Sequence, residues 1–261
     1  MKTSIAETNR ANQIQRKLIA ATLFACVAVL AITAPPAVAA TDKITSSTAL
    51  TLRTPSQQIS DAALLDVGIP TLNDGLYLTD ESDTVFPEVR YAEAIYFSNQ
   101  LAKVMEKSGA WGAIRVTPTD SVIMDLYITG TILQSDGETM DLDIQVRDSS
   151  GKQWFAKNYK QTTGKYAYDR RLKRLGDPFQ NLFIRIANDL LAYREKLSEQ
   201  QAIELRTISE LRFAKSFSPE AFDSYVSERR DGTLKIDRLP AENDSILMRV
   251  RKIRDRDYLY I

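Results

Sequence analysis

The chain has 261 residues, 44% of them hydrophobic, and its 34 basic and 34 acidic side chains give a formal net charge of zero. Because the sequence contains no histidine, it lacks the commonest general base and metal ligand near neutral pH, and a serine triad has no imidazole to work with. Nucleic-acid binding requires a clearly basic domain, so we expect no nucleic-acid partner.

Residues 1–40 have the pattern of a secretory signal peptide. A polar segment with four basic side chains precedes the unbroken run of apolar and small residues at 18–34, and more small residues follow. Ala37-x-Ala39 and Val38-x-Ala40 match the small-residue cleavage rule, so we predict cleavage after Ala39 or Ala40. The protein is then expected to be periplasmic or associated with the cell envelope.

Two alternatives to a cleaved signal peptide remain open. The run 18–34 is near the lower length limit for crossing a bilayer, so it also fits an uncleaved N-terminal anchor. Leu23-Phe-Ala-Cys26 loosely resembles a lipoprotein signal with a lipid-modified Cys26, although Phe24 fits poorly. Cys26 is the only cysteine, so its removal leaves no disulfide or thiolate. The cleaved signal peptide and both alternatives place the body of the protein outside the cytoplasm. The two alternatives would also associate it with the membrane.

The next residues predict a flexible leader followed by the start of a sheet domain. Residues 41–58 are rich in Thr and Ser and have little periodicity, which is typical of a flexible segment. Residues 62–68 and 75–78 are expected to form short strands. Asn73-Asp-Gly75 between them is a turn signal, because these residues tolerate positive φ.

Residues 88–108 carry a helical pattern. Pro87 before the pattern and Gly109 after it match the usual preference for proline at the start and glycine after the end of a helix. A short strand is expected at 111–118. The apolar residues that define the predicted buried side of the helix are Ala94, Ile95, Leu101, Val104 and Met105.

Residues 121–160 predict three antiparallel strands joined by two tight turns. Apolar and polar residues alternate with period 2, and glycine-bearing turns separate the strands. We therefore predict an α+β domain at 59–165, an antiparallel sheet with a helix packed on one face. The predicted inward residues are Leu126, Ile128, Gly130, Ile132, Met140, Leu142, Ile144 and Val146; the predicted outward residues are Asp125, Tyr127, Thr129, Thr131, Asp141, Asp143, Gln145 and Arg147.

Residues 177–261 predict a helical C-terminal region. Asp177-Pro178 has the form of a helix start, and Ser198-Glu-Gln-Gln201 has the form of a capping box that restarts a helix. Ser218-Pro219 begins a shorter helix, Asp231-Gly232 is a turn, and a last helix is expected around 246–253.

Two charged groups carry the candidate sites. Asp141 and Asp143, about 7 Å apart along one strand face, would serve a carboxylate-dependent hydrolase or a hard cation; a solvated outer face is the simpler interpretation. The second group would contact anionic lipid headgroups or an acidic partner, or would form the solvated side of an amphipathic helix. It consists of Arg249, Arg251, Lys252, Arg254 and Arg256.

The aromatic residues near the predicted sheet are expected to belong to its core, although an exposed group would suit a sugar or peptide. They are Tyr91, Tyr96, Phe97, Trp111, Trp154, Phe155, Tyr159, Tyr166 and Tyr168.

Residues 88–160 resemble a known family in pattern. The predicted helix, Gly109-Ala-Trp-Gly-Ala-Ile-Arg-Val116, Asp125-Leu-Tyr-Ile-Thr-Gly-Thr-Ile132 and the hairpin to Trp154 are similar to the envelope auxiliary lipoproteins of ABC-type transport systems. The resemblance implies a helix on a small sheet and a non-catalytic role in assembly or lipid trafficking. It transfers no functional residue.

These observations together predict an exported, non-catalytic cell-envelope protein that acts through protein or lipid contacts. We expect no catalytic residue, no cofactor and no metal site. A carboxylate-dependent hydrolase and an N-terminally anchored scaffold are the alternatives.

Overall fold

A computed structural model describes residues 42–45, 50–79, 85–164, 177–241 and 243–258. Contacts divide the chain into residues 1–38 and residues 39–261, and all the described residues belong to the second unit. The predicted signal peptide, its cleavage positions Ala39 and Ala40, and Cys26 lie outside the described residues. Among the described helices, none is both long and apolar enough to cross a bilayer.

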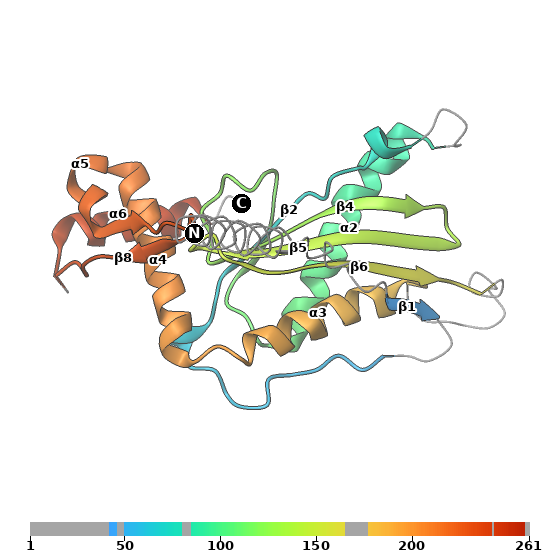
Figure 1. Ribbon diagram of the computed structural model, residues 1–261, viewed down its shortest axis with the longest axis horizontal. Helices are drawn as coiled ribbons and strands as arrows, with labels where there is room; N and C mark the ends of the chain where they lie inside the picture. The colour runs from blue at the N-terminus through green and yellow to red at the C-terminus, as the bar shows by residue number, and fades with distance from the viewer. Residues whose placement is uncertain (1–41, 46–49, 80–84, 165–176, 242, 259–261) are drawn as a thin grey trace, which may run out of the picture. The chain divides into compact units, whose positions relative to one another are not determined.

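The sheet has six strands in the order β1-β6-β5-β4-β2-β3. At its centre, β4 (Leu126–Ser135), β5 (Thr139–Asp148) and β6 (Gln153–Thr162) form the predicted antiparallel meander. Gly137 and Gly151 adopt positive φ, 81° and 90°, in the two connecting turns, a conformation that glycine tolerates without steric cost. The α+β fold class is thus confirmed, and Figure 1 shows the meander.

The outer strands pair in parallel, which the sequence pattern did not predict. β2 (Val67–Pro70) lies between β4 and β3 (Ile114–Thr117) and runs parallel to both. β1 (Asp42–Thr45) pairs in parallel with β6. Parallel neighbours need a crossover connection, and α2 (Pro87–Ser108) supplies it between β2 and β3.

Two short segments differ from their predicted strands. Residues 62–68 contribute only the start of β2, and a 3-10 helix, η1 (Asp61–Ala63), precedes it. Residues 75–78 form a turn and the 3-10 helix η2 (Leu76–Leu78) instead of a strand. Gly75 adopts a φ of 69°, and its carbonyl accepts a bond of 2.9 Å from the Leu78 amide, which closes the turn.

The remaining elements form the C-terminal part of the described chain. The capping box is confirmed, because the Ser198 hydroxyl accepts from the Gln201 amide and the Gln201 side chain accepts from the Ser198 amide. Residues 226–236 form a two-stranded hairpin that was not predicted. The elements are α3 (Gln180–Arg194), α4 (Glu199–Phe217), α5 (Pro219–Phe222), η4 (Asp223–Tyr225), β7 (Val226–Glu228), β8 (Leu234–Ile236) and α6 (Ser245–Asp257).

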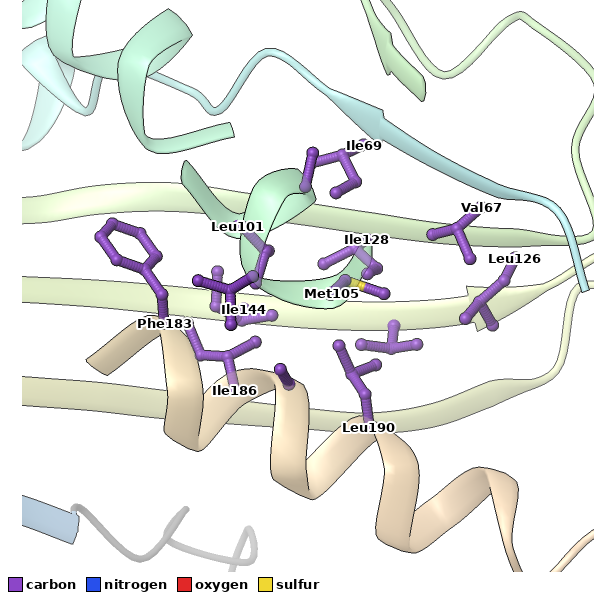
Figure 2. Packing of buried hydrophobic residues seen from close by; sticks show 14 of the residues in the cluster. Val67, Ile69, Leu101, Met105, Leu126, Ile128, Ile144, Phe183, Ile186 and Leu190 are labelled. Carbon is purple, nitrogen blue, oxygen red and sulfur yellow. The ribbon is translucent and has the colours of Figure 1, made fainter. Parts of the chain in front are cut away.

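The first hydrophobic core lies between the meander and two helices. α2 contributes Leu101 and Met105, and α3 contributes Phe183, Ile186 and Leu190, all buried against inward residues of the strands such as Ile144 (Figure 2). All the predicted inward apolar residues of β4 and β5 are buried. Because α3 and the start of α4 share this core, it extends beyond the predicted domain boundary at residue 165.

Part of the predicted flexible leader lies along α3. The Leu50 amide donates to the Asn181 side chain at 3.0 Å, and the Arg53 amide donates to the Asn188 side chain at 2.8 Å. Arg53 also forms an ion pair of 2.8 Å with Glu195. Hydrogen bonds across more than a hundred residues of sequence therefore hold the described part of this segment.

A second, smaller core joins the C-terminal elements. Its buried residues come from α4, α5, β7 and α6, so α4 takes part in both cores. They are Leu211, Ala214, Phe222, Val226, Leu247 and Val250.

Candidate interaction surfaces

The acidic outer face of β5 does not form a carboxylate pair around a cavity. Asp141 accepts a bond from Asn158 at 2.5 Å and forms an ion pair of 3.0 Å with Lys160 on the neighbouring strand. Asp143 lies opposite Thr131 and Asn158 in the sheet register. Among the described residues no group of carboxylates is arranged to hold a metal ion. This geometry is that of a polar sheet face and gives the hydrolase alternative no support.

The predicted basic run divides into two groups on α6. Arg251 and Arg254 are directed toward the rest of the protein. Arg251 forms a two-pronged ion pair with Glu210 of α4, one prong measuring 2.9 Å, and Arg254 lies 4.0 Å from the same carboxylate. Arg249, Lys252 and Arg256 are exposed, as Arg251 also is, but they form no ion pair with a described residue of another element.

Two of the aromatic residues assigned to the core lie instead on the exposed side of α2. Tyr91 is 54% exposed and Tyr96 is 46% exposed, and Ile95, predicted to be buried, is also exposed. Residue 95 is displaced from the buried centre of the helix because Ala94 and Ser98 occupy the face that meets the sheet. Phe97, Trp111, Trp154 and Tyr159 are buried as predicted, and Tyr166 and Tyr168 lie outside the described residues.

Three exposed apolar side chains, together with several polar residues, line a pocket where the start of α2 meets the tip of the β4–β5 hairpin. Phe86, Val89 and Leu133 are 62%, 54% and 40% exposed, and all three line one cavity of about 750 Å³. We call this cavity the hairpin groove. The hairpin contributes its remaining lining through residues 134–137.

Leu133 reaches the groove because the strand pairing is irregular there. The register of β4 with β5 shifts between Ile132 and Gln134, so Leu133 is an extra residue in its strand. Ile132 stays buried while Leu133 is exposed. A bulge of this kind redirects a side chain and ends regular pairing. Two consecutive apolar residues at 132–133 break the period-2 pattern, and this was the sequence signal that could have located the groove.

The polar groups beside the groove are satisfied within the protein. The buried Arg90 forms an ion pair of 3.3 Å with Glu93 and donates to the Asp74 carbonyl at 3.5 Å. Glu93 in turn accepts a bond of 2.7 Å from the Ser135 hydroxyl. Among the described residues, Phe86, Val89 and Leu133 keep apolar surface exposed in the groove. Exposed apolar side chains gathered at one place on a folded protein are a feature of protein contact sites and ligand-binding grooves.

A cluster of buried polar groups around Asp125 connects the sheet to α4, and the sequence pattern did not indicate it. We call Asp125 with its contacts to Asp66, Ser209 and Arg206 the Asp125 joint. Asp125 was predicted to be solvated, but it is only 4% exposed. Its carboxylate accepts bonds from the Asp66 amide, at 2.8 Å, and from the Ser209 hydroxyl. Arg206 lies 3.7 Å away. Burial raises the pKa of the Asp125 carboxyl, while the hydrogen bond from Ser209 opposes that rise.

Tyr127, also predicted to face solvent, is buried at the same joint. Its hydroxyl accepts a bond of 2.8 Å from the Met124 amide. The guanidinium groups of Arg147 and Arg212 each lie 6.0 Å from its ring. Residues of α4 therefore cover the outward face at the start of β4, whereas Thr129 and Thr131 further along the strand are half-buried.

Comparison with known proteins identifies no family. No protein-family model matches the chain, and no curated protein matches it. A solved structure, a PelC variant dodecamer from Paraburkholderia phytofirmans, is similar with a TM-score of 0.29 and 16% sequence identity. The likeness covers 54% of this chain and 92% of that one. At this TM-score it supports no inference about function.

Proposed function

We propose that this protein is an exported, non-catalytic component of the cell envelope that acts by binding another protein. Its role would be in assembly, as an auxiliary to transport, or in structure. Export rests on the signal-peptide pattern of residues 1–40. The resemblance of residues 88–160 to envelope auxiliary lipoproteins of ABC-type transport systems is consistent with this role.

The single observation that supports a binding role is the hairpin groove. Phe86, Val89 and Leu133 present apolar surface in a cavity whose neighbouring charges already have partners. Such a surface is costly to leave in water, and burying it against a partner recovers roughly 25 cal/mol for each Å² covered.

Co-purification from native envelopes tests the proposal. The tagged protein should recover a defined partner, and a Val89→Ser, Leu133→Ser variant should lose that partner while remaining folded. Both side chains are exposed, so their replacement removes little buried contact. A matched control, Tyr91→Ser, changes another exposed α2 side chain outside the groove lining. Recovery of the same partner by the groove variant would contradict the proposal.

N-terminal sequencing of protein from the envelope fraction separates the export alternatives. A mature N-terminus at Ala40 or Thr41 is expected and excludes a retained anchor. A lipid-modified N-terminus at Cys26 identifies a lipoprotein, and an intact N-terminus identifies the anchored scaffold.

A further inference from the structure

Helix α6 has one face that is fixed to the protein. Leu247 and Val250 are buried in the second core, and Arg251 pairs with Glu210 of α4. After the helix ends, the Tyr258 hydroxyl donates a bond of 2.5 Å to the Ile123 carbonyl, and Arg115 donates to the Tyr258 carbonyl at 3.0 Å. The helix is therefore held at its middle and at its C-terminal end.

The opposite face of α6 carries a row of cations. With about 100° between successive residues, Arg249, Lys252 and Arg256 fall within an arc of about 60°. Their side of the helix is opposite that of Leu247 and Val250. Seven residues of helix advance by about 10 Å, so the three charges form a line along the outer face. We call these three residues the cationic row.

The cationic row is largely without partners in the described chain. No ion pair with a described residue involves Arg249 or Lys252, and Arg256 contacts only the adjacent Asp257, at 3.2 Å. That pair is exposed, and such pairs contribute little to stability, so Arg256 can exchange it for another anion. The second acidic residue of the helix, Asp255, lies 3.7 Å from Arg254 and to one side of the row.

Apolar side chains flank the row on both sides. Ile246 is 45% exposed and Met248 is 47% exposed, and their helical positions lie on either side of Arg249. A cationic row with exposed apolar neighbours suits a helix that lies in a lipid interface, with its charges among headgroup phosphates and its apolar side chains at the acyl boundary. An acidic protein surface would use the charges but not this apolar flank.

We propose that α6 binds the surface of a bilayer containing anionic phospholipid through Arg249, Lys252 and Arg256. This inference rests on the proposed function, which assigns the protein to the envelope, and it names a lipid surface as a second contact beside the protein partner. The attachment is peripheral, and the groove and the cationic row are separate sites. They lie near opposite ends of β4, since Ser135 meets α2 whereas the Asp125 joint before Leu126 meets α4.

Vesicle binding tests the proposal with defined lipids. Protein purified from the envelope fraction is sedimented with vesicles of phosphatidylcholine containing phosphatidylglycerol, and with vesicles of phosphatidylcholine alone. The charged vesicles should bind the protein, and added salt should weaken binding. The Arg249→Gln, Lys252→Gln, Arg256→Gln variant should bind about a hundredfold more weakly, because each basic residue near an anionic surface contributes about fivefold.

A matched variant controls for net charge. Lys103→Gln, Lys107→Gln, Lys152→Gln removes the same charge from exposed positions on α2 and the β5–β6 turn and should bind as the unchanged protein does. Equal losses in the two variants, retained binding by the α6 variant, or no preference for charged vesicles would overturn the proposal. Because the vesicle assay contains no partner protein, a negative result would count against lipid binding by α6 only. The hypothesis that the hairpin groove binds a protein is tested separately by co-purification.

Discussion

The two hydrophobic cores of the described chain differ in size and in the elements that form them. The first has 31 buried apolar residues, supplied by the sheet and its helices, whereas the second has six. Apolar packing of α2 and α3 on the strands forms most of the first core, and buried polar contacts such as Ser98 with Pro70 lie beside it. The second core also has polar contacts beside it, namely Arg251 with Glu210 and Tyr258 with Ile123. The groove thus lies on the more robust scaffold, and the cationic row lies on the weaker one.

Truncation in the first core should have the largest effect on stability. Ile144 is fully buried between α2, α3 and the neighbouring strands. Replacing Ile144 with alanine removes three buried carbons and leaves a cavity, so we expect the free energy of unfolding to fall by about 4 kcal/mol. Urea denaturation should show this loss in a single transition that includes the whole sheet. A loss below about 1 kcal/mol would show that the sheet core is loosely packed.

Truncation in the second core should cost less and act locally. Leu247→Ala removes a buried contact between α6 and α4, with an expected loss of about 2 to 3 kcal/mol. Hydrogen exchange should accelerate in α5, β7, β8 and α6 while the amides of β4 and β5 stay protected. Equal acceleration in β5 would mean that the two cores unfold as one unit.

The Asp125 joint, which connects the two regions, should make stability depend on pH. Burial raises the pKa of Asp125 in the folded protein, so between its unfolded and folded values the folded protein holds one more proton. The contribution of the protonated form is fully present below the unfolded pKa, about 3.9, and is lost as pH rises through the folded pKa. The unchanged protein should therefore lose stability relative to Asp125→Asn as the pH rises from the unfolded pKa through the raised folded pKa. Parallel stability curves for the two proteins would contradict the assignment.

The smallest effect is expected at the ion pair that holds α6. Glu210→Gln leaves Arg251 with a neutral partner, and we expect a loss of about 0.5 to 1 kcal/mol, confined to the second core. Arg256→Gln, which breaks only an exposed pair with its neighbour, serves as the control and should leave stability unchanged. Hydrogen-exchange rates of the α6 amides measure the effects of both substitutions on local stability. An effect of Arg256→Gln as large as that of Glu210→Gln would show that the Glu210 contact has no special role.

Local patterns in the sequence predicted the elements whose structure depends on near neighbours. The meander, the bounds of α2 and the capping box of α4 follow from alternation, helical spacing and terminal residues. The parallel pairing of β2 was not predictable in this way, because it joins residues separated by the whole of α2. The burial of Asp125 was not predictable for the same reason. Its position in the alternation indicates a solvated residue, but Ser209 and Arg206 of a helix distant in sequence cover it.

The candidate surfaces also combine features that local sequence patterns predict with features that depend on distant contacts. The sequence identified all five cations of the last helix, but only their packing against Glu210 and Tyr258 separates the structural pair from the cationic row. The groove depends on a β-bulge at Leu133 and on the approach of the hairpin tip to α2, which Glu93 and Ser135 connect. Those contacts form only after the sheet has assembled.

Site-specific photo-crosslinking in intact envelopes tests the binding role most directly. A photoreactive amino acid in place of Val89, within the groove, should give one discrete adduct with a partner protein. The same amino acid in place of Lys103, on the exposed side of α2 away from the groove lining, should give none. No adduct from position 89, or the same adduct from both positions, would contradict a groove that binds a specific protein.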